Sequence, residues 1–177
     1  NFDGLMKAYA LLPSTIRAEY QLVIASRLSK GSDDSRTKLY QWRDQAGLKE
    51  DELVLTDFVP DDDLVILYNI ADLFVFPSKH EGFGLPPLEA MACGAPTLAS
   101  NTSSLPEVIG WDQALFDPHS PPDMARKMEQ ALIDSAFRLS LKEHALNQVK
   151  NFSWDSSAKR AIAALEALHV KNQAASA

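Results

Sequence analysis

The chain has 177 residues, of which 46% are hydrophobic and 23% are charged, values ordinary for one folded globular domain. Its 17 Lys and Arg against 24 Asp and Glu give a net charge of −7, which argues against nucleic acid as the main partner because binding a phosphate backbone needs a basic face. A single cysteine excludes an intramolecular disulfide, and no apolar run approaches the ~20 residues of a membrane span.

Short apolar runs alternate along the chain with longer segments of helical periodicity. The runs predict strands over residues 22–25, 53–55, 73–76, 97–99 and 114–116. Helical spacing and capping residues predict helices over 3–12, 32–47, 61–68, 87–93, 105–109, 121–132, 137–150 and 153–169. We expect Trp154 to anchor the packing of the last helix and the tail from Lys171 to Ala177 to be frayed.

This alternation defines the fold class. Strands separated by helices of ten or more residues indicate βαβ units with right-handed crossovers, and hence a parallel sheet covered on both faces. No internal repeat or long linker divides the chain. The sequence therefore predicts one α/β domain over residues 1–177, a Rossmann-like three-layer α/β/α arrangement.

One loop stands out as a candidate site. In open α/β sheets, ligands bind outside the carboxyl ends of the strands, which here precede the loops after Ser26, Thr56, Phe76 and Ser100. The loop after Phe76 reads SKHEGFGLPPLE, and its two glycines allow the backbone to approach a ligand closely. The helix that follows would present a partial positive charge to a diphosphate.

Two carboxylates bracket this turn, Glu81 before it and Glu89 in the helix. Carboxylates accept hydrogen bonds from hydroxyl groups, so the pair could hold the two hydroxylated ends of a ligand with phosphate between them, such as a nucleotide-sugar. The same residues also fit a structural interpretation, in which Glu89 only complements the helix dipole and the glycines only form a turn.

The segment EGFGLPPLEAMACGAP, residues 81–96, resembles the signature of glycosyltransferase family 4, the retaining group 1 enzymes of GT-B fold. Its mark is two glutamates separated by seven residues, as Glu81 and Glu89 are. Further resemblance lies in residues 57–60, 67–72, 103–108, 115–118 and 152–154. The resemblance covers nearly the whole chain. It implies that the chain is the C-terminal, donor-binding half of a GT-B glycosyltransferase.

The resemblance also implies a role for each matching residue. Glu81 would be the catalytic residue, orienting the donor sugar and stabilising charge that develops on it, and Glu89 would bind the ribose hydroxyls. The donor sugar and diphosphate would lie against His80, Gly82, Phe83, Gly84 and Leu85, and the nucleobase against Val59 and Asp61. His80 fits an exposed loop histidine equally well. The resemblance implies no metal and no cofactor, with a GDP- or UDP-linked sugar as substrate.

Parts of the family pattern are absent. Members carry an Arg and a Lys after the first strand of this domain, and this sequence begins at the residue that follows that Lys. The glycine-rich turn usual after the next strand is replaced by SRLSKG, residues 26–31. We therefore expect a fragment without its first strand and without the N-terminal acceptor domain, inactive by itself.

As a whole, the protein is expected to move a hexose, with mannose favoured, to a glycan or lipid-linked acceptor bound by the missing domain. The expected location is cytoplasmic, with peripheral contact to the inner face of the membrane left open, as is the oligomeric state. Two alternatives stay open: a GT-B epimerase or phosphorylase relative, and a degenerate interaction domain without catalysis. A phosphorylase would need a pyridoxal-binding lysine, for which no motif is present.

Other polar residues fit structural roles better. The run Asp61-Asp62-Asp63 precedes an apolar helical segment, which favours a helix start over a metal site. Ser103 and Ser104 are expected to be turn or capping residues, and Cys93 a small core residue.

Overall fold

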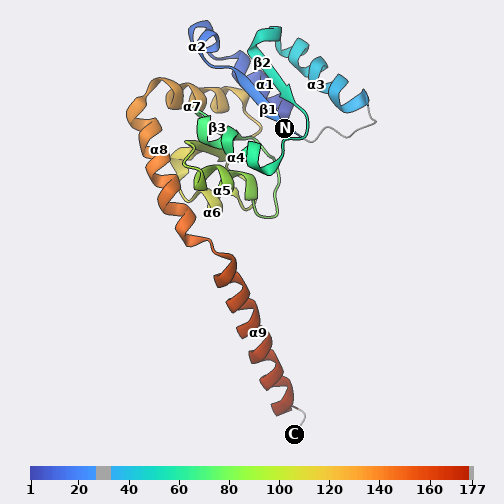
Figure 1. Cartoon of the computed structure of the whole chain (residues 1–177), viewed down its shortest axis with the longest axis vertical. Coiled ribbons are helices and arrows are strands. Elements are labelled where there is room, and N and C mark those ends of the chain that lie inside the picture. Colours follow the sequence, from blue (N-terminus) through green and yellow to red (C-terminus); the bar gives the residue numbers. More distant parts are fainter. Residues whose placement is uncertain (27–32, 176–177) are drawn as a thin grey trace.

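A computed structural model describes residues 1–26 and 33–175 (Figure 1). Within them, each predicted strand is present to within one residue of its expected ends. They are β1 (Leu22–Ala25), β2 (Leu53–Thr56), β3 (Phe74–Phe76), β4 (Thr97–Ser100) and β5 (Leu115–Phe116). The predicted turn at residues 26–31 and the start of the helix predicted at 32 fall mostly outside the described residues.

All observed strand pairs are parallel, which confirms the predicted α/β class. β1 pairs with β2 from Leu22 opposite Leu53 onward. β3 pairs with β4, and β4 with β5. Among the described residues the ladder therefore has two parts, β1-β2 and β3-β4-β5, with no hydrogen-bonded pairing between β1 and β3.

Helices connect and flank these strands. They are α1 (Phe2–Ala10), α2 (Ser14–Glu19), α3 (Asp33–Ala46), α4 (Asp61–Ile70), α5 (Leu85–Ala92), α6 (Leu105–Ile109), α7 (Pro121–Ile133), α8 (Ser135–Gln148) and α9 (Trp154–Ala175). α2 is absent from the prediction, since it is six residues long and buries only Ile16. α4 begins at Asp61, as the acidic run predicts.

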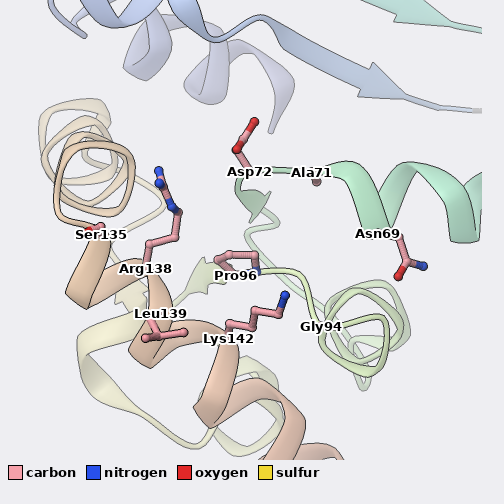
Figure 2. A pocket seen from close by; sticks show the side chains of 9 residues that line it. All are labelled: Asn69, Ala71, Asp72, Gly94, Pro96, Ser135, Arg138, Leu139 and Lys142. Atoms are coloured by element: carbon pink, nitrogen blue, oxygen red, sulfur yellow. The ribbon is translucent and has the colours of Figure 1, made fainter.

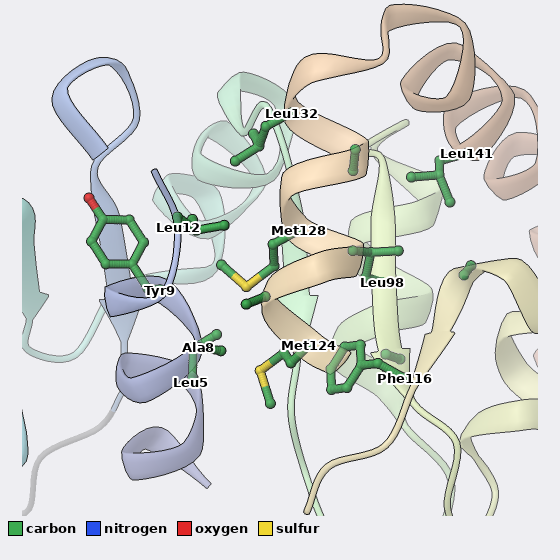
Figure 3. Close-up of a cluster of buried hydrophobic side chains, with 14 of the residues drawn as sticks. Leu5, Ala8, Tyr9, Leu12, Leu98, Phe116, Met124, Met128, Leu132 and Leu141 are labelled. Atoms are coloured by element: carbon green, nitrogen blue, oxygen red, sulfur yellow. The ribbon is translucent and has the colours of Figure 1, made fainter. Parts of the chain in front are cut away.

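The core lies between α1, α7 and the strands (Figure 3). Met124, Met128 and Leu132 of α7 face α1 on one side, and Leu98 of β4 and Phe116 of β5 lie on the other. Each fully buried side chain of this size contributes roughly 1.5–3 kcal/mol to folding. This packing holds α1 against α7, which in turn packs against β5 of the β3-β4-β5 part of the sheet.

The C-terminal helix α9 extends away from the rest of the molecule (Figure 1). Ser153 caps it, because the Ser156 N–H donates to Ser153 Oγ at 3.3 Å. Two expectations are wrong here. The helix runs to Ala175 rather than ending near His169, and Trp154 is 81% exposed, since it stands where the chain leaves the domain.

Candidate functional site

The carboxyl ends of the parallel strands bring three loops to one edge of the molecule, residues 57–60 after β2, 77–84 after β3 and 101–104 after β4. The start of α1 reaches the same edge. There the Asn1 side-chain amide donates to the carbonyl oxygens of Pro77 and Pro118, each at 2.9 Å. The predicted site loop therefore lies where α/β proteins bind ligands.

Gly84 ends this loop as the N-cap of α5, with φ +110°, a conformation that favours glycine. A Cβ at this position would lie 2.8 Å from Leu105 Cδ2 of α6. Gly82 differs, because a Cβ there would meet no atom within 4 Å. Gly84 is thus required by close packing, whereas Gly82 leaves open space beside the backbone.

Two serines of the loop after β4 hold the Glu81 backbone. The Glu81 N–H donates to Ser103 Oγ at 3.0 Å, and Ser104 Oγ donates to the carbonyls of Glu81 at 3.2 Å and Phe83 at 2.7 Å. Ser103 has φ +51°, an uncommon conformation for a residue other than glycine. The sequence identified these serines as turn residues but did not reveal that they brace the candidate site.

The start of α5 has fewer N–H donors than an ordinary helix. Pro86 and Pro87 occupy its first turn and lack an N–H, and the Leu88 N–H already reaches the Gly84 carbonyl at 3.4 Å. Of the four N–H positions that a helix start normally leaves unbonded, Gly84 to Pro87, only Gly84 and Leu85 therefore carry an N–H. An anion at this helix start would depend on Leu85 and the backbone before it.

Glu89 lies one turn into α5 with an exposed side chain. Its Oε2 accepts a hydrogen bond from the Tyr68 hydroxyl of α4 at 3.3 Å. Tyr68 is only 7% exposed, and its ring meets Phe74 edge-on with centroids 5.4 Å apart. Burial, followed by the charge and hydrogen bond of Glu89, raises the pKa of Tyr68. Tyr68 is a site neighbour that the sequence prediction missed.

The remaining predicted residues lie around this centre. Phe83 is 40% exposed and packs edge-on against Phe152, with ring centroids 5.7 Å apart. Leu85 and His80 are exposed, and the His80 carbonyl accepts from Ser78 Oγ at 3.2 Å.

Val59 and Asp61, the predicted nucleobase contacts, lie in the loop after β2 and at the first residue of α4. Val59 is half-buried and Asp61 is exposed. They share the carboxyl edge with the other predicted residues. Among the residues described, however, no hydrogen bond joins either of them to Glu81 or Glu89.

A separate pocket of ≈ 320 Å³ lies at the opposite edge, just before β3 and β4 (Figure 2). Arg138 and Lys142 of α8 line it on one side, and Asp72 and Pro96 on the other. None of the predicted site residues lines this pocket.

The family model described as "Glycosyl transferases group 1" matches residues 1–148. The chain belongs to this family, which confirms the resemblance carried by the two glutamates.

Similar proteins are known by name. The serotype-specific mannosyltransferase WbdA of Escherichia coli is 49% identical over 162 residues, 92% of this chain and 20% of that protein. The O-antigen chain mannosyltransferase B of the same species is 39% identical over 168 residues, 95% of this chain and 43% of that protein. The chain thus spans less than half the length of either relative.

A solved structure shares the fold. The structure of HepE from Anabaena in complex with UDP-glucose has a TM-score of 0.79 and 21% identity, covering 93% of this chain and 44% of that one. The GT-B-type domain fold predicted from the sequence is confirmed.

Across residues 1–26 and 33–175, no helix is both long and apolar enough to cross a membrane. In the same part of the chain, no three His, Cys, Asp or Glu side chains are grouped so that they could hold a metal ion. The cytoplasmic location stays a prediction.

Proposed function

We propose that this chain is the donor-binding domain of a retaining glycosyltransferase that moves a hexose, with mannose favoured, from a nucleoside diphosphate sugar to a glycan or lipid-linked acceptor. The observation that carries the proposal is the braced loop from Glu81 to Gly84, which leads into α5 and Glu89 at the carboxyl edge of the sheet. The preference for mannose rests on the two mannosyltransferase relatives. A nucleotide-linked donor is supported by the UDP-glucose bound to a protein of the same fold.

In this proposal the two acids hold opposite ends of the donor. Glu89 accepts hydrogen bonds from the ribose hydroxyls, and Glu81 accepts them from the sugar. The diphosphate lies between them, against the N–H groups of Phe83, Gly84 and Leu85. Because Pro86 and Pro87 contribute no N–H, the short stretch before them must supply these donors.

Glu81 is proposed to orient the sugar and to stabilise positive charge at the anomeric carbon as the bond to the diphosphate breaks. Fixing its backbone to Ser103 and Ser104 serves this role, because electrostatic stabilisation requires a group already in place. His80 and the pair Val59 and Asp61 are proposed as contacts to the donor sugar and the nucleobase. In the described part of the chain, no hydrogen bond ties the side chains of these three residues to Glu81 or Glu89, so their roles rest on the resemblance to the family.

We propose that this domain works with an acceptor-binding domain and with a further strand between β1 and β3. The absence of a ladder between β1 and β3 among the described residues supports the strand, and the greater length of the relatives supports the additional domain. We expect no sugar transfer by the 177-residue chain alone. Measurable sugar transfer by the isolated chain would contradict the proposal that the acceptor-binding domain and the further strand are required.

The function is tested by titrating the full-length protein with GDP, UDP and GDP-mannose in a calorimeter. Glu89→Ala should lower nucleotide affinity by about 1.5–3 kcal/mol, the loss of hydrogen bonds to a charged group. Glu129→Ala, which removes an acid from α7 away from the loop, serves as the control. Absence of nucleotide binding by the parent protein would refute the enzyme interpretation and favour a non-catalytic interaction domain.

A further inference from the structure

We propose that Tyr68 is a positioning residue that sets the orientation of the Glu89 carboxylate and thereby the selectivity of the site for a ribose over a deoxyribose. The inference rests on the proposed binding of ribose by Glu89 and adds a determinant to it. Tyr68 belongs to α4, a different element from the glutamates, and acts on the donor only through Glu89.

The contrast in freedom between the two side chains carries the inference. Glu89 is exposed, so its carboxylate has several accessible rotamers, and holding one of them costs conformational entropy. Tyr68 is fixed, since it is 7% exposed and belongs to a buried cluster with Ala90 and Ala95. Its ring also packs edge-on against Phe74. The rigid partner therefore determines where the mobile one lies.

The hydrogen bond also has a definite direction. The phenol is the donor and Glu89 Oε2 the acceptor, at 3.3 Å. Burial and the adjacent carboxylate raise the pKa of Tyr68, so the hydroxyl keeps its proton at neutral pH and remains a donor. With one lone pair of Oε2 occupied, Oε1 and the remaining lone pair of Oε2 are left for two ribose hydroxyls.

The contact further explains why a tyrosine stands at this position. The hydroxyl of a buried tyrosine needs a partner, and here its partner is an exposed carboxylate rather than a backbone carbonyl. Phenylalanine would fill the same space and pack equally well against Phe74. The hydroxyl is thus an addition to the packing, and its loss can be tested without removing the ring.

The test is Tyr68→Phe in the full-length protein, with affinities measured for GDP, 2′-deoxy-GDP and inorganic pyrophosphate. We expect GDP affinity to fall roughly three- to tenfold, the effect of one hydrogen bond. The preference for GDP over 2′-deoxy-GDP should shrink, while pyrophosphate affinity stays unchanged. Tyr68→Met provides a second removal of the hydroxyl by a side chain of different shape.

The matched control is Tyr9→Phe. Tyr9 is 2% exposed, and its hydroxyl donates to the Tyr20 carbonyl at 2.8 Å, so the substitution removes a buried phenol hydrogen bond outside the predicted site. It should lower stability and leave the ratio of GDP to 2′-deoxy-GDP affinity unchanged. A merely structural role for Tyr68 would give the same pattern and would overturn the inference.

Glu89→Gln separates this inference from the proposed function. If it weakens GDP binding and Tyr68→Phe does not, the ribose role of Glu89 stands and the role of Tyr68 is refuted. If Glu89→Gln itself has no effect, both are refuted. Positioning through Glu89 also requires that Tyr68→Phe has no further effect on GDP affinity in a Glu89→Ala background, which removes the acceptor of the Tyr68 hydroxyl, and additive losses would contradict it.

Discussion

Ser104 joins two loops that follow different strands. Its hydroxyl is shared between the carbonyls of Glu81 and Phe83, so one side chain fixes both ends of the EGF segment. Small displacements of a catalytic group reduce the rate more than they reduce substrate binding, because the transition state demands the more precise geometry. The residue should therefore matter for turnover more than for affinity.

We expect Ser104→Ala to lower kcat by roughly tenfold, with a smaller change in the donor KM, since the Glu81 backbone loses a donor. Steady-state kinetics of the full-length enzyme measure this split. Ser140→Ala is the control, because Ser140 Oγ also donates to a carbonyl, that of Ala136 at 2.9 Å within α8. An unchanged kcat for Ser104→Ala would show that Ser103 alone suffices to hold the loop.

Gly84→Ala should destabilise the domain by about 1–3 kcal/mol, because φ is +110° and the new Cβ would meet Leu105. Urea unfolding of the purified chain gives this number. Gly82→Ala tests the interpretation within the same loop, since its Cβ would enter open space and its φ is not in the left-handed region. Equal destabilisation by both substitutions would contradict the assignment of strain to Gly84.

Residues of the site differed in how far the sequence could identify them. Glu81, Glu89 and Gly84 lie in one continuous segment, so their spacing alone placed them together. Ser104 and Tyr68 reach that segment from 21 residues away in the chain, and such a contact depends on how loops meet across the sheet. The sequence did contain an indication that Tyr68 contacts another polar residue. A tyrosine on the apolar face of a helix is buried, and its hydroxyl then needs a hydrogen-bond acceptor.

At the scale of elements, α7 is held at its start by a charged cap. The Asp123 carboxylate accepts from the Asp117 N–H at 3.0 Å and from the Arg126 guanidinium at 2.6 Å, while its own N–H donates to Ser120 Oγ. Burial alone would raise the pKa of Asp123, but these donors together hold it below its ordinary value of 3.8. The ionised carboxylate is thus favoured by the folded state.

Asp123→Asn should therefore lower the free energy of unfolding at neutral pH by about 1 kcal/mol. Because the folded pKa is the depressed one, the contribution is fully present above pH 3.8 and is lost as the pH falls through the lower, folded-state pKa. Denaturation at pH 7 and at acid pH measures the difference. Asp155→Asn, in the exposed first turn of α9, should show little change at either pH.

Strands were predicted more accurately than the short helix. The strands are short runs of consecutive apolar residues, which is a clear pattern even where, as in β1 and β2, Val23 and Val54 are exposed. α2, in contrast, buries one side chain, and a single apolar residue has no periodicity to detect. The predicted end of α9, near His169, is too early. The described side chains of this helix are exposed, so no change from buried to exposed positions marks its end.

For the whole molecule, the sequence predicted one α/β unit, and the structure adds how its two parts are joined. β1-β2 and β3-β4-β5 share no ladder among the described residues, whereas α1 packs against both α3 and α7. Leu5, Met6 and Tyr9 of α1 belong to one buried cluster that includes side chains of both parts. The sequence pattern does not show that the β1-β2 and β3-β4-β5 ladders are separate. Periodicity identifies which residues form strands, but it does not identify which strands pair with each other.

The nine residues of α1 therefore join the β1-β2 part to the β3-β4-β5 part. Without this helix, we expect the two parts to unfold independently. Met6 is fully buried, and Met6→Ala should cost about 2–5 kcal/mol and divide the single calorimetric unfolding peak of the 177-residue chain into two. Leu11→Ala, at a 57% exposed position just after the same helix, should leave one peak. A single peak at lower temperature for Met6→Ala would instead reveal a cooperative unit that does not depend on this helix.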